Sequence, residues 1–243
     1  MTFKEVFAAE KPIIGMLHLR GYGREEVLRI AREEIETMIR CGVDAVLVEN
    51  YFGDKLDVIA VLEMLKAEYT GKVVYGVNVL GDFEASCELA HRYGAKFMQV
   101  DTVCGHLKPN RDAAYADMIA QVRKKYPVFV LGGVRFKYQP VLSGRSLEED
   151  LTIGMTRCDA IVVTGEGTGM DTDIEKIRAF RSIMGDFPLI VGAGMTPESV
   201  AEQLAIADGG IVGSYFKYEG QAHNPMEEKR VIRFMNSVQA LRK

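Results

Sequence analysis

The sequence has no excess of basic residues and no long apolar run. Of its 243 residues, 30 are Lys or Arg and 34 are Asp or Glu, so the formal net charge is −4. Proteins that bind nucleic acid usually carry a basic excess, so we expect no nucleic-acid partner, although small anions remain compatible. The first apolar run follows acidic residues and is only about seven residues long, too short for a signal peptide or a membrane span. We therefore expect a cytoplasmic protein with no membrane insertion.

Cysteine is scarce and never closely paired. Cys41, Cys87, Cys104 and Cys158 are isolated in the sequence and lack the spacing that structural zinc or a redox motif needs. We expect these cysteines to be reduced and buried. The glycine-lysine-serine or glycine-lysine-threonine pattern of a P-loop is also missing, which argues against nucleotide binding of that kind.

What the sequence does contain is a series of short, nearly continuous apolar runs. Runs of this kind are typical of parallel strands that are buried on both faces. In order they are IIGMLHL, AVLVEN, VVYGVNV, KFMQVD, VFVLGGV, AIVVTG, PLIVGAG and GGIVGS.

Segments with helical periodicity separate these runs. One example is Val27, Ala31, Ile35 and Met38, which share one face of a helix. Strand starts recur roughly every 20 to 30 residues, the length of one strand–helix unit, and eight such units make one (β/α)8 TIM barrel. No linker or low-complexity run interrupts the series, so we predict a single TIM-barrel domain over residues 1–243. A doubly wound open sheet is the alternative, because periodicity does not show closure.

In a TIM barrel the active site lies at the C-terminal ends of the strands. The residues at or just beyond those ends are therefore the candidates for function. They are His18, Glu49, Asn50, Asn78, Asp101, Lys137, Thr164, the segment from Gly192 to Gly194, Gly213 and Ser214.

Five of these residues are candidates for catalysis. Glu49 and Asp101 are the strongest, because an acid that ends an apolar run is costly to bury unless it is paired or used. His18 and Asn78 are equally compatible with hydrogen-bonded core positions. Lys137 is either a solvated loop lysine or a group that polarises a carbonyl or forms a Schiff base.

The last two strands end in glycine-rich turns that suit phosphate. Glycines let backbone N–H groups approach an anion, and the loops after strands seven and eight are the usual phosphate site of this fold. We therefore expect Gly192, Ala193 and Gly194 to face Gly213 and Ser214 across a bound phosphate. Tight packing at strand–helix corners is the alternative explanation of these glycines.

A further glycine-rich stretch, VVTGEGTGMDTD, follows strand six. Thr164, Gly165, Thr168 and Gly169 extend the phosphate site in this interpretation, or they form a lid over it.

These motifs together resemble the BtpA/SgcQ family. The stretches that carry the likeness are KPIIGMLHL, VDAVLVEN, YGVNVL, DAIVVTGEGTG, LIVGAGMTPESV, ADGGIVGSYFKYEG and NPMEEKRVIRFM, from Lys11 to Met235. The resemblance implies a TIM barrel of the ribulose-phosphate-binding type. It implies no single reaction: one member of that family is linked to photosystem I biogenesis, and another has been assigned as a nucleoside triphosphatase.

The chain departs from the family pattern at two strands. The family has an alanine–aspartate pair on strand five, followed by lysine–histidine, where this chain has Gly132 and Gly133 and then Lys137 and Tyr138. The family's asparagine at the end of strand four is Asp101 here. Three outcomes are open: the acidic role has moved to Asp101, the substrate has changed, or activity has been lost.

The sequence leads to one main functional expectation and several alternatives. We expect an enzyme, a lyase of the aldolase type or an isomerase, that acts on a phosphorylated small metabolite such as a sugar phosphate. A divalent cation, Mg²⁺ or Mn²⁺, held by Glu49, Asp101 and either His18 or Asn78 is a variant of this hypothesis. The alternatives are an assembly factor without catalysis and a nucleotide phosphohydrolase. A homo-oligomer is compatible with this kind of barrel.

Overall fold

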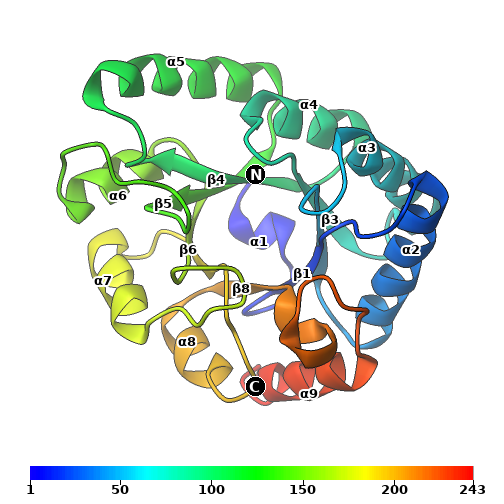
Figure 1. Cartoon of the computed structure of the whole chain (residues 1–243). Coiled ribbons are helices and arrows are strands. Elements are labelled where there is room, and N and C mark those ends of the chain that lie inside the picture. Colours follow the sequence, from blue (N-terminus) through cyan, green and yellow to red (C-terminus); the bar gives the residue numbers. More distant parts are fainter. Residues whose placement is uncertain (243) are drawn as a thin grey trace.

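The computed structural model describes residues 1–242 and shows a closed parallel barrel (Figure 1). Its eight strands follow one another around the barrel in sequence order, and the last strand pairs with the first through Ile13 and Gly210. This closure confirms the predicted TIM barrel. It also shows that the alternative of an open, doubly wound sheet is wrong.

All eight predicted apolar runs form strands. The residues of nearly every strand are buried along its length, because helices cover the outer face and side chains fill the interior. The strands are β1 (Ile13–Leu17), β2 (Ala45–Glu49), β3 (Val74–Asn78), β4 (Phe97–Cys104), β5 (Phe129–Val134), β6 (Ala160–Val163), β7 (Leu189–Val191) and β8 (Gly209–Val212).

The helices form a ring outside the barrel (Figure 1). Helix α2 illustrates the cause: Val27, Ala31, Ile35 and Met38 recur at helical spacing and are all buried against the strands. The helical elements are α1 (Phe3–Val6), α2 (Arg24–Arg40), α3 (Lys55–Met64), η1 (Leu65–Tyr69), α4 (Phe83–Tyr93), α5 (Pro109–Lys125), α6 (Leu147–Met155), α7 (Ile174–Met184), α8 (Val200–Ile206), η2 (Ser214–Phe216), η3 (Tyr218–Gly220) and α9 (Glu228–Gln239).

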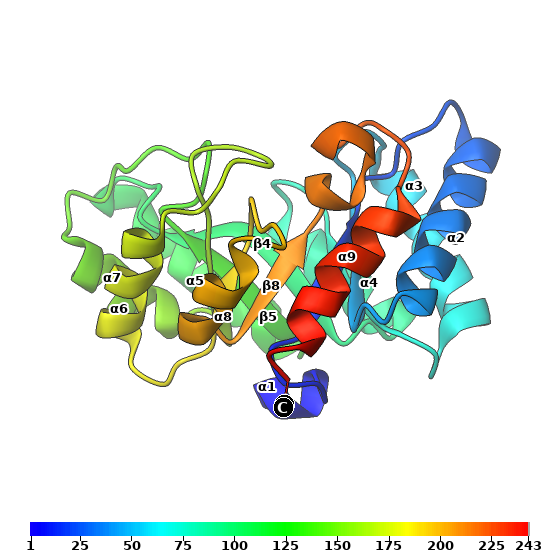
Figure 2. The ribbon, with the colours of Figure 1, turned by 90° about the horizontal axis from the view of Figure 1, so that it is seen from below.

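Helix α1 covers the N-terminal end of the barrel, opposite the end where η2 and η3 lie (Figure 2). The ring of Phe7 packs 5.2 Å from that of Phe97 and 6.4 Å from that of Phe129, at the bottom of the barrel interior. Apolar side chains from the strands fill the layer above. The interior is therefore closed at the bottom, and a ligand can enter only at the C-terminal end of the strands.

Two threonines hold the loops after β6 and β7. Thr196 lies in the turn before α8, which begins at Val200, and its hydroxyl accepts from the Ser199 N–H at 3.3 Å. The Thr172 hydroxyl donates to the Ala193 carbonyl at 2.9 Å, and the next residue, Asp173, caps α7.

Strand β4 contains an irregularity that shapes the site. Its register with β5 shifts between Val100 and Cys104, so the backbone at Asp101 bends toward β5. A Cβ atom placed on Gly133 would lie 1.9 Å from the Asp101 carbonyl oxygen and 2.5 Å from the Phe136 ring. The glycine at this position is therefore a requirement of the β4 backbone path.

The four cysteines form no disulfide. Three of them are buried, as expected, but Cys41 is partly exposed, so the prediction that all four are buried is wrong. Within residues 1–242, none of the helices combines the length and apolar character needed to cross a membrane.

We predict that Gly133→Ala destabilises the fold by about 3 kcal/mol or more, because the new methyl group meets backbone that cannot move away. Gly167→Ala is the matched control. There the methyl group meets only the Met170 sulfur and the Tyr138 hydroxyl, both at the ends of flexible side chains, so a change within about 0.5 kcal/mol is expected. Urea unfolding of the two variants measures this, and equal stabilities would show that β4 relaxes freely.

Candidate active site

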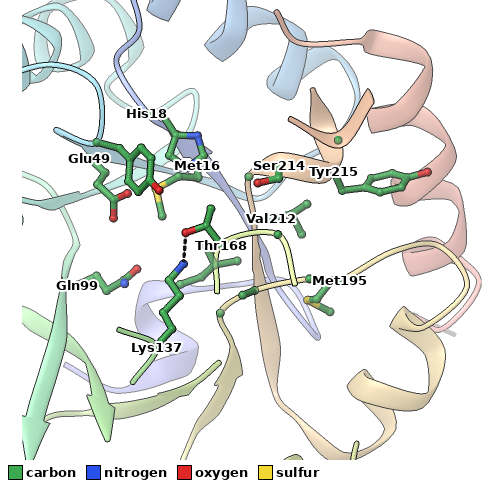
Figure 3. A pocket seen from close by; sticks show the side chains of 18 of the residues that line it. Met16, His18, Glu49, Gln99, Lys137, Thr168, Met195, Val212, Ser214 and Tyr215 are labelled. Atoms are coloured by element: carbon green, nitrogen blue, oxygen red, sulfur yellow. Dashed lines mark hydrogen bonds between the residues drawn. The ribbon is translucent and has the colours of Figure 1, made fainter. Parts of the chain in front are cut away.

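A pocket of about 480 Å³ opens at the C-terminal end of the barrel. It lies where the sequence predicts the functional residues, at the ends of the strands and in the loops that follow (Figure 3). Eleven of the predicted site residues line it: His18, Glu49, Asp101, Lys137, Thr168, Gly169, Gly192, Ala193, Gly194, Gly213 and Ser214. Four others do not: Asn50, whose side-chain oxygen accepts from the Leu80 N–H at 2.8 Å, and Asn78, Thr164 and Gly165.

Two carboxylates meet at one side of the pocket through an amide. The Asn78 Nδ2 atom donates to Glu49 Oε2 at 2.9 Å and lies 3.4 Å from Asp101 Oδ1. The three residues come from the ends of β2, β3 and β4, which are neighbours in the barrel. Asn78 therefore holds the two acids together from below the pocket surface.

Burial changes the acidity of both carboxyl groups. It raises the pKa of Glu49 from 4.5 to about 7, and the neighbouring Asp101 carboxylate adds to the rise, while Lys137 and the hydrogen bond from Asn78 oppose it. Burial also raises the pKa of Asp101. A carboxyl group with a pKa near neutrality can take up and release a proton at physiological pH, which is what a general acid or base must do.

Lys137 forms the wall beside the acids. Its Nζ atom donates to the Thr168 hydroxyl at 3.2 Å, and its backbone N–H donates to the Thr164 hydroxyl at 2.9 Å. The ammonium group points into the pocket in Figure 3. The loops after β5 and β6 therefore meet over this lysine, and Thr168 holds its charge in place.

His18 follows the end of β1 and is buried and electrically neutral. Burial lowers its pKa to about 3, and the positive charges of Lys217 and Lys137 contribute to the shift. The ring packs against Gly213, where a Cβ atom would lie 2.8 Å from the His18 ring carbon Cε1. His18 Nδ1 is buried and has no hydrogen-bond partner among residues 1–242. A neutral imidazole at this place can donate or accept a hydrogen bond but cannot serve as a cation.

The glycine-rich turns after β7 and β8 face the opposite side of the pocket. The backbone N–H groups of Ala193, Gly194 and Gly213 have no hydrogen-bond partner in the described part of the chain, whereas that of Gly192 donates to Val163. Gly194 has φ of +73°, and a Cβ atom there would lie 2.1 Å from the Met170 carbonyl oxygen. Free N–H groups on two adjacent turns are suitable donors for an anion.

Thr164 and Gly165 hold the β6 loop together and do not reach the pocket. The Thr164 carbonyl accepts from Lys176 Nζ at 2.7 Å. Gly165 faces the Asp171 carbonyl oxygen, which would lie 2.3 Å from an added Cβ atom. The loop contributes Thr168 and Gly169 to the pocket instead.

Gln99 and Arg230 are among the polar residues of the pocket that sequence reasoning missed. Gln99 lies on β4, two residues before Asp101, and its signal is a single polar residue inside an apolar run. Arg230 comes from α9; its Nε atom donates to the Tyr215 carbonyl at 2.6 Å, and its guanidinium stacks 4.3 Å from the Tyr215 ring centre. Nothing in the sequence indicates that α9 reaches the pocket, because that depends on how the helix ring closes.

The residues of the pocket provide only a limited set of metal ligands. Residues 1–242 contain no group of three or more His, Cys, Asp and Glu side chains placed to hold a metal ion. The Asn78 nitrogen donates to both carboxylates. Glu49 and Asp101 are the paired carboxylates that could serve as oxygen ligands.

A model of the BtpA family matches residues 9–240. An uncharacterised protein of Thermococcus kodakarensis is 29% identical, over 96% of this chain and 97% of that protein. The sgc region protein SgcQ of Escherichia coli is 27% identical over 99% and 98%. The photosystem I biogenesis protein BtpA of Synechocystis is 24% identical over 98% and 91%.

Solved structures share the fold at low sequence identity. A structure described as native KDPGal has a TM-score of 0.65 and 15% identity, over 94% of this chain and 95% of that chain. Phosphoribosyl anthranilate isomerase from Thermus thermophilus has a TM-score of 0.63 and 14% identity, over 95% and 100%. These similarities concern the barrel architecture.

The raised pKa of Glu49 predicts a pH-dependent stability. The folded state holds this proton more tightly than the unfolded chain, so the carboxyl group stabilises the fold most below pH 4.5 and this stabilisation is lost as pH rises through about 7. Glu49→Gln stays neutral and keeps an oxygen for Asn78. We expect its stability relative to the unmodified protein to rise by about 2 to 3 kcal/mol between about pH 5 and about pH 8.

Urea unfolding at the two pH values measures this difference. Glu148 is exposed, and Glu148→Gln is the control: its free energy of unfolding should differ from that of the unmodified protein by the same amount at both pH values. If the difference for Glu49→Gln is also the same at both pH values, then Glu49 ionises in the folded protein as it does in the unfolded chain.

Proposed function

The chain belongs to the BtpA family, and on that premise we propose that it is an enzyme acting on a phosphorylated small metabolite, with sugar phosphates as the substrate class. One observation carries the proposal. A single pocket has free backbone N–H groups at Ala193, Gly194 and Gly213 on one side and the Glu49–Asp101 pair on the other. The first set suits a phosphate group, and the second suits proton transfer.

The phosphate group would lie between the turns after β7 and β8. Ser214 lines the pocket beside Gly213 and adds a hydroxyl group, while Arg230 supplies a positive charge nearby. An anion in this place would gain hydrogen bonds from N–H groups that are otherwise free. Loops after the seventh and eighth strands are also the usual phosphate site in TIM barrels.

The reacting part of the substrate would lie between the acids and Lys137. In this proposal the ionised Glu49 or Asp101 takes a proton from a carbon next to a carbonyl group, and the electron pair of the C–H bond moves onto the carbonyl oxygen. Lys137 donates a hydrogen bond to that oxygen as negative charge develops on it. Return of the proton to the carbonyl carbon, with transfer of the neighbouring hydroxyl proton to the former carbonyl oxygen, completes an isomerisation. In the aldolase type of reaction the carboxylate instead takes the proton of a hydroxyl group β to the carbonyl: the O–H electron pair forms a new C=O bond, the carbon–carbon bond breaks, and its electron pair moves onto the original carbonyl as an enolate.

A divalent cation is a separate proposal for the same site. Glu49 and Asp101 would hold Mg²⁺ or Mn²⁺ if the Asn78 amide turned its oxygen toward the ion, with water completing the shell. A rise in melting temperature with Mg²⁺ that disappears in Asp101→Asn would support it. Unchanged ligand binding after exhaustive chelation would count against it.

We predict that phosphate esters raise the melting temperature of the protein. At about a hundredfold excess over Kd, binding adds about 2.7 kcal/mol, which corresponds to a shift of several degrees for a chain of this size. Ser214→Glu places a carboxylate beside the phosphate turns and should abolish the shift produced by sugar phosphates and inorganic phosphate.

The control for this experiment is Ser182→Glu, which adds the same charge on the exposed side of α7 and should leave the shift intact. Failure of every phosphorylated compound to shift the melting temperature would refute the phosphate assignment. It would favour the assembly role that the photosystem I relative suggests, or another ligand.

A further inference from the structure

Gln99 is a buried amide without a hydrogen bond. Only 3% of the residue is exposed, it lines the pocket, and its buried Oε1 atom has no hydrogen-bond partner among residues 1–242. Leaving a buried polar group unpaired destabilises a fold, so native structures contain few such groups. An unpaired amide inside a pocket points to a partner that arrives with the ligand.

The other unpaired atoms place this observation in context. In the described part of the chain, buried side-chain atoms without a partner occur at His18 Nδ1, Arg20 Nε, Gln99 Oε1 and Arg242 Nε. The two arginines lie outside the pocket and each has a carboxylate beside it: Arg20 Nε lies 3.6 Å from Glu34 Oε1, and Arg242 contacts Asp44 through its other nitrogen atoms. Both remaining residues, His18 and Gln99, line the same pocket. The two unpaired atoms outside the arginines, His18 Nδ1 and Gln99 Oε1, therefore belong to residues of the pocket where a ligand would bind.

The surroundings of Gln99 indicate the chemistry of the missing partner. Glu49 and Asp101, which line the same pocket, present carboxylate oxygens, and Met16 and Phe136 supply apolar walls. Lys137 is the cation near the two acids. A carboxylate on the ligand would be repelled by the two acids, whereas a hydroxyl group can donate hydrogen bonds to them and to the Gln99 oxygen.

We propose that Gln99 is a specificity-determining residue whose amide binds neighbouring hydroxyl groups of the ligand, so that the pocket selects polyhydroxylated phosphate esters. The inference rests on the proposed function, because the phosphate group fixes one end of the ligand.

The position and chemistry of the amide support this role. Gln99 lies two residues before Asp101 on β4, so both side chains face the barrel interior, with Gln99 one layer deeper. In Figure 3 its amide points into the cavity that Glu49 and Lys137 also border. A carboxamide accepts one hydrogen bond and donates another, and this pair of functions matches two adjacent hydroxyl groups. The ligand chain would therefore run from the turns after β7 and β8 down to Gln99, past the two acids.

The test compares two ligands and two variants. One ligand is glucitol 6-phosphate, in which all carbon atoms except the phosphorylated one carry a hydroxyl group. The other is hexyl phosphate, which has the same chain length and no hydroxyl group. Inorganic phosphate reports the phosphate turns alone. Gln99→Met removes the amide and keeps the size of the side chain. Gln203→Met is the matched control, because Gln203 is also buried but donates to Asp171 at 2.9 Å outside the pocket.

The proposal predicts a specific loss in one variant. The unmodified protein should bind glucitol 6-phosphate more tightly than hexyl phosphate, and Gln99→Met should weaken the binding of glucitol 6-phosphate by about tenfold. Binding of hexyl phosphate and of inorganic phosphate should stay the same. Gln203→Met should keep the preference for the hydroxylated ligand.

The melting temperature of the ligand-free variants gives an independent measurement. Gln99→Met removes an unpaired polar group and should melt at the same temperature as the unmodified protein or higher, whereas Gln203→Met breaks a hydrogen bond and should melt lower. A lower melting temperature for Gln99→Met would assign the residue a structural role and overturn the proposal.

The binding results separate two failures. If hexyl phosphate and inorganic phosphate bind but the preference for glucitol 6-phosphate is absent, or survives in Gln99→Met, then the role of Gln99 is wrong while the phosphate site stands. If none of the three compounds binds, then the proposed function fails and the inference falls with it.

Discussion

The candidate site depends on the hydrogen bonds of one amide. Asn78, at the end of β3, donates to Glu49 on β2 and lies within reach of Asp101 on β4. Without a donor between them, two carboxylates in one buried place would repel each other strongly. The amide lets both acids face the same cavity, while burial and the neighbouring Asp101 charge raise the pKa of Glu49 to about 7. The proposed proton transfer follows from this arrangement.

The backbone of β4 explains why strand five has glycine at position 133. The register shift after Val100 brings the Asp101 carbonyl against Gly133, which leaves no room for a side chain there. An aspartate on strand five, which the resemblance to the family leads one to expect, is incompatible with this path. The departure on strand five is thus a consequence of the β4 backbone, while the side chain of Asp101 lines the pocket.

The sequence predicts the barrel and the part of the pocket lining at the strand ends because both follow from the strands. A parallel strand buried on both faces has a recognisable apolar run, and its C-terminal end marks the site, as at Glu49 and Gly213. The loops are harder to predict, since glycine spacing does not show which way a turn faces; Thr164 therefore looks like a phosphate ligand but holds Lys137. Contacts from distant helices, such as that of Arg230, arise only when the ring of helices closes.

The proposed proton transfer requires a carboxyl group in the pocket that exchanges its proton near neutral pH. Titration of the side-chain carboxyl carbons by ¹³C NMR measures this directly, with Glu49→Gln used to assign the resonance of Glu49. We expect a Glu49 midpoint near pH 7, displaced downward in Asp101→Asn, because the neighbouring negative charge is removed. Midpoints for both acids in the ordinary range of exposed carboxyl groups would contradict the proposed proton transfer.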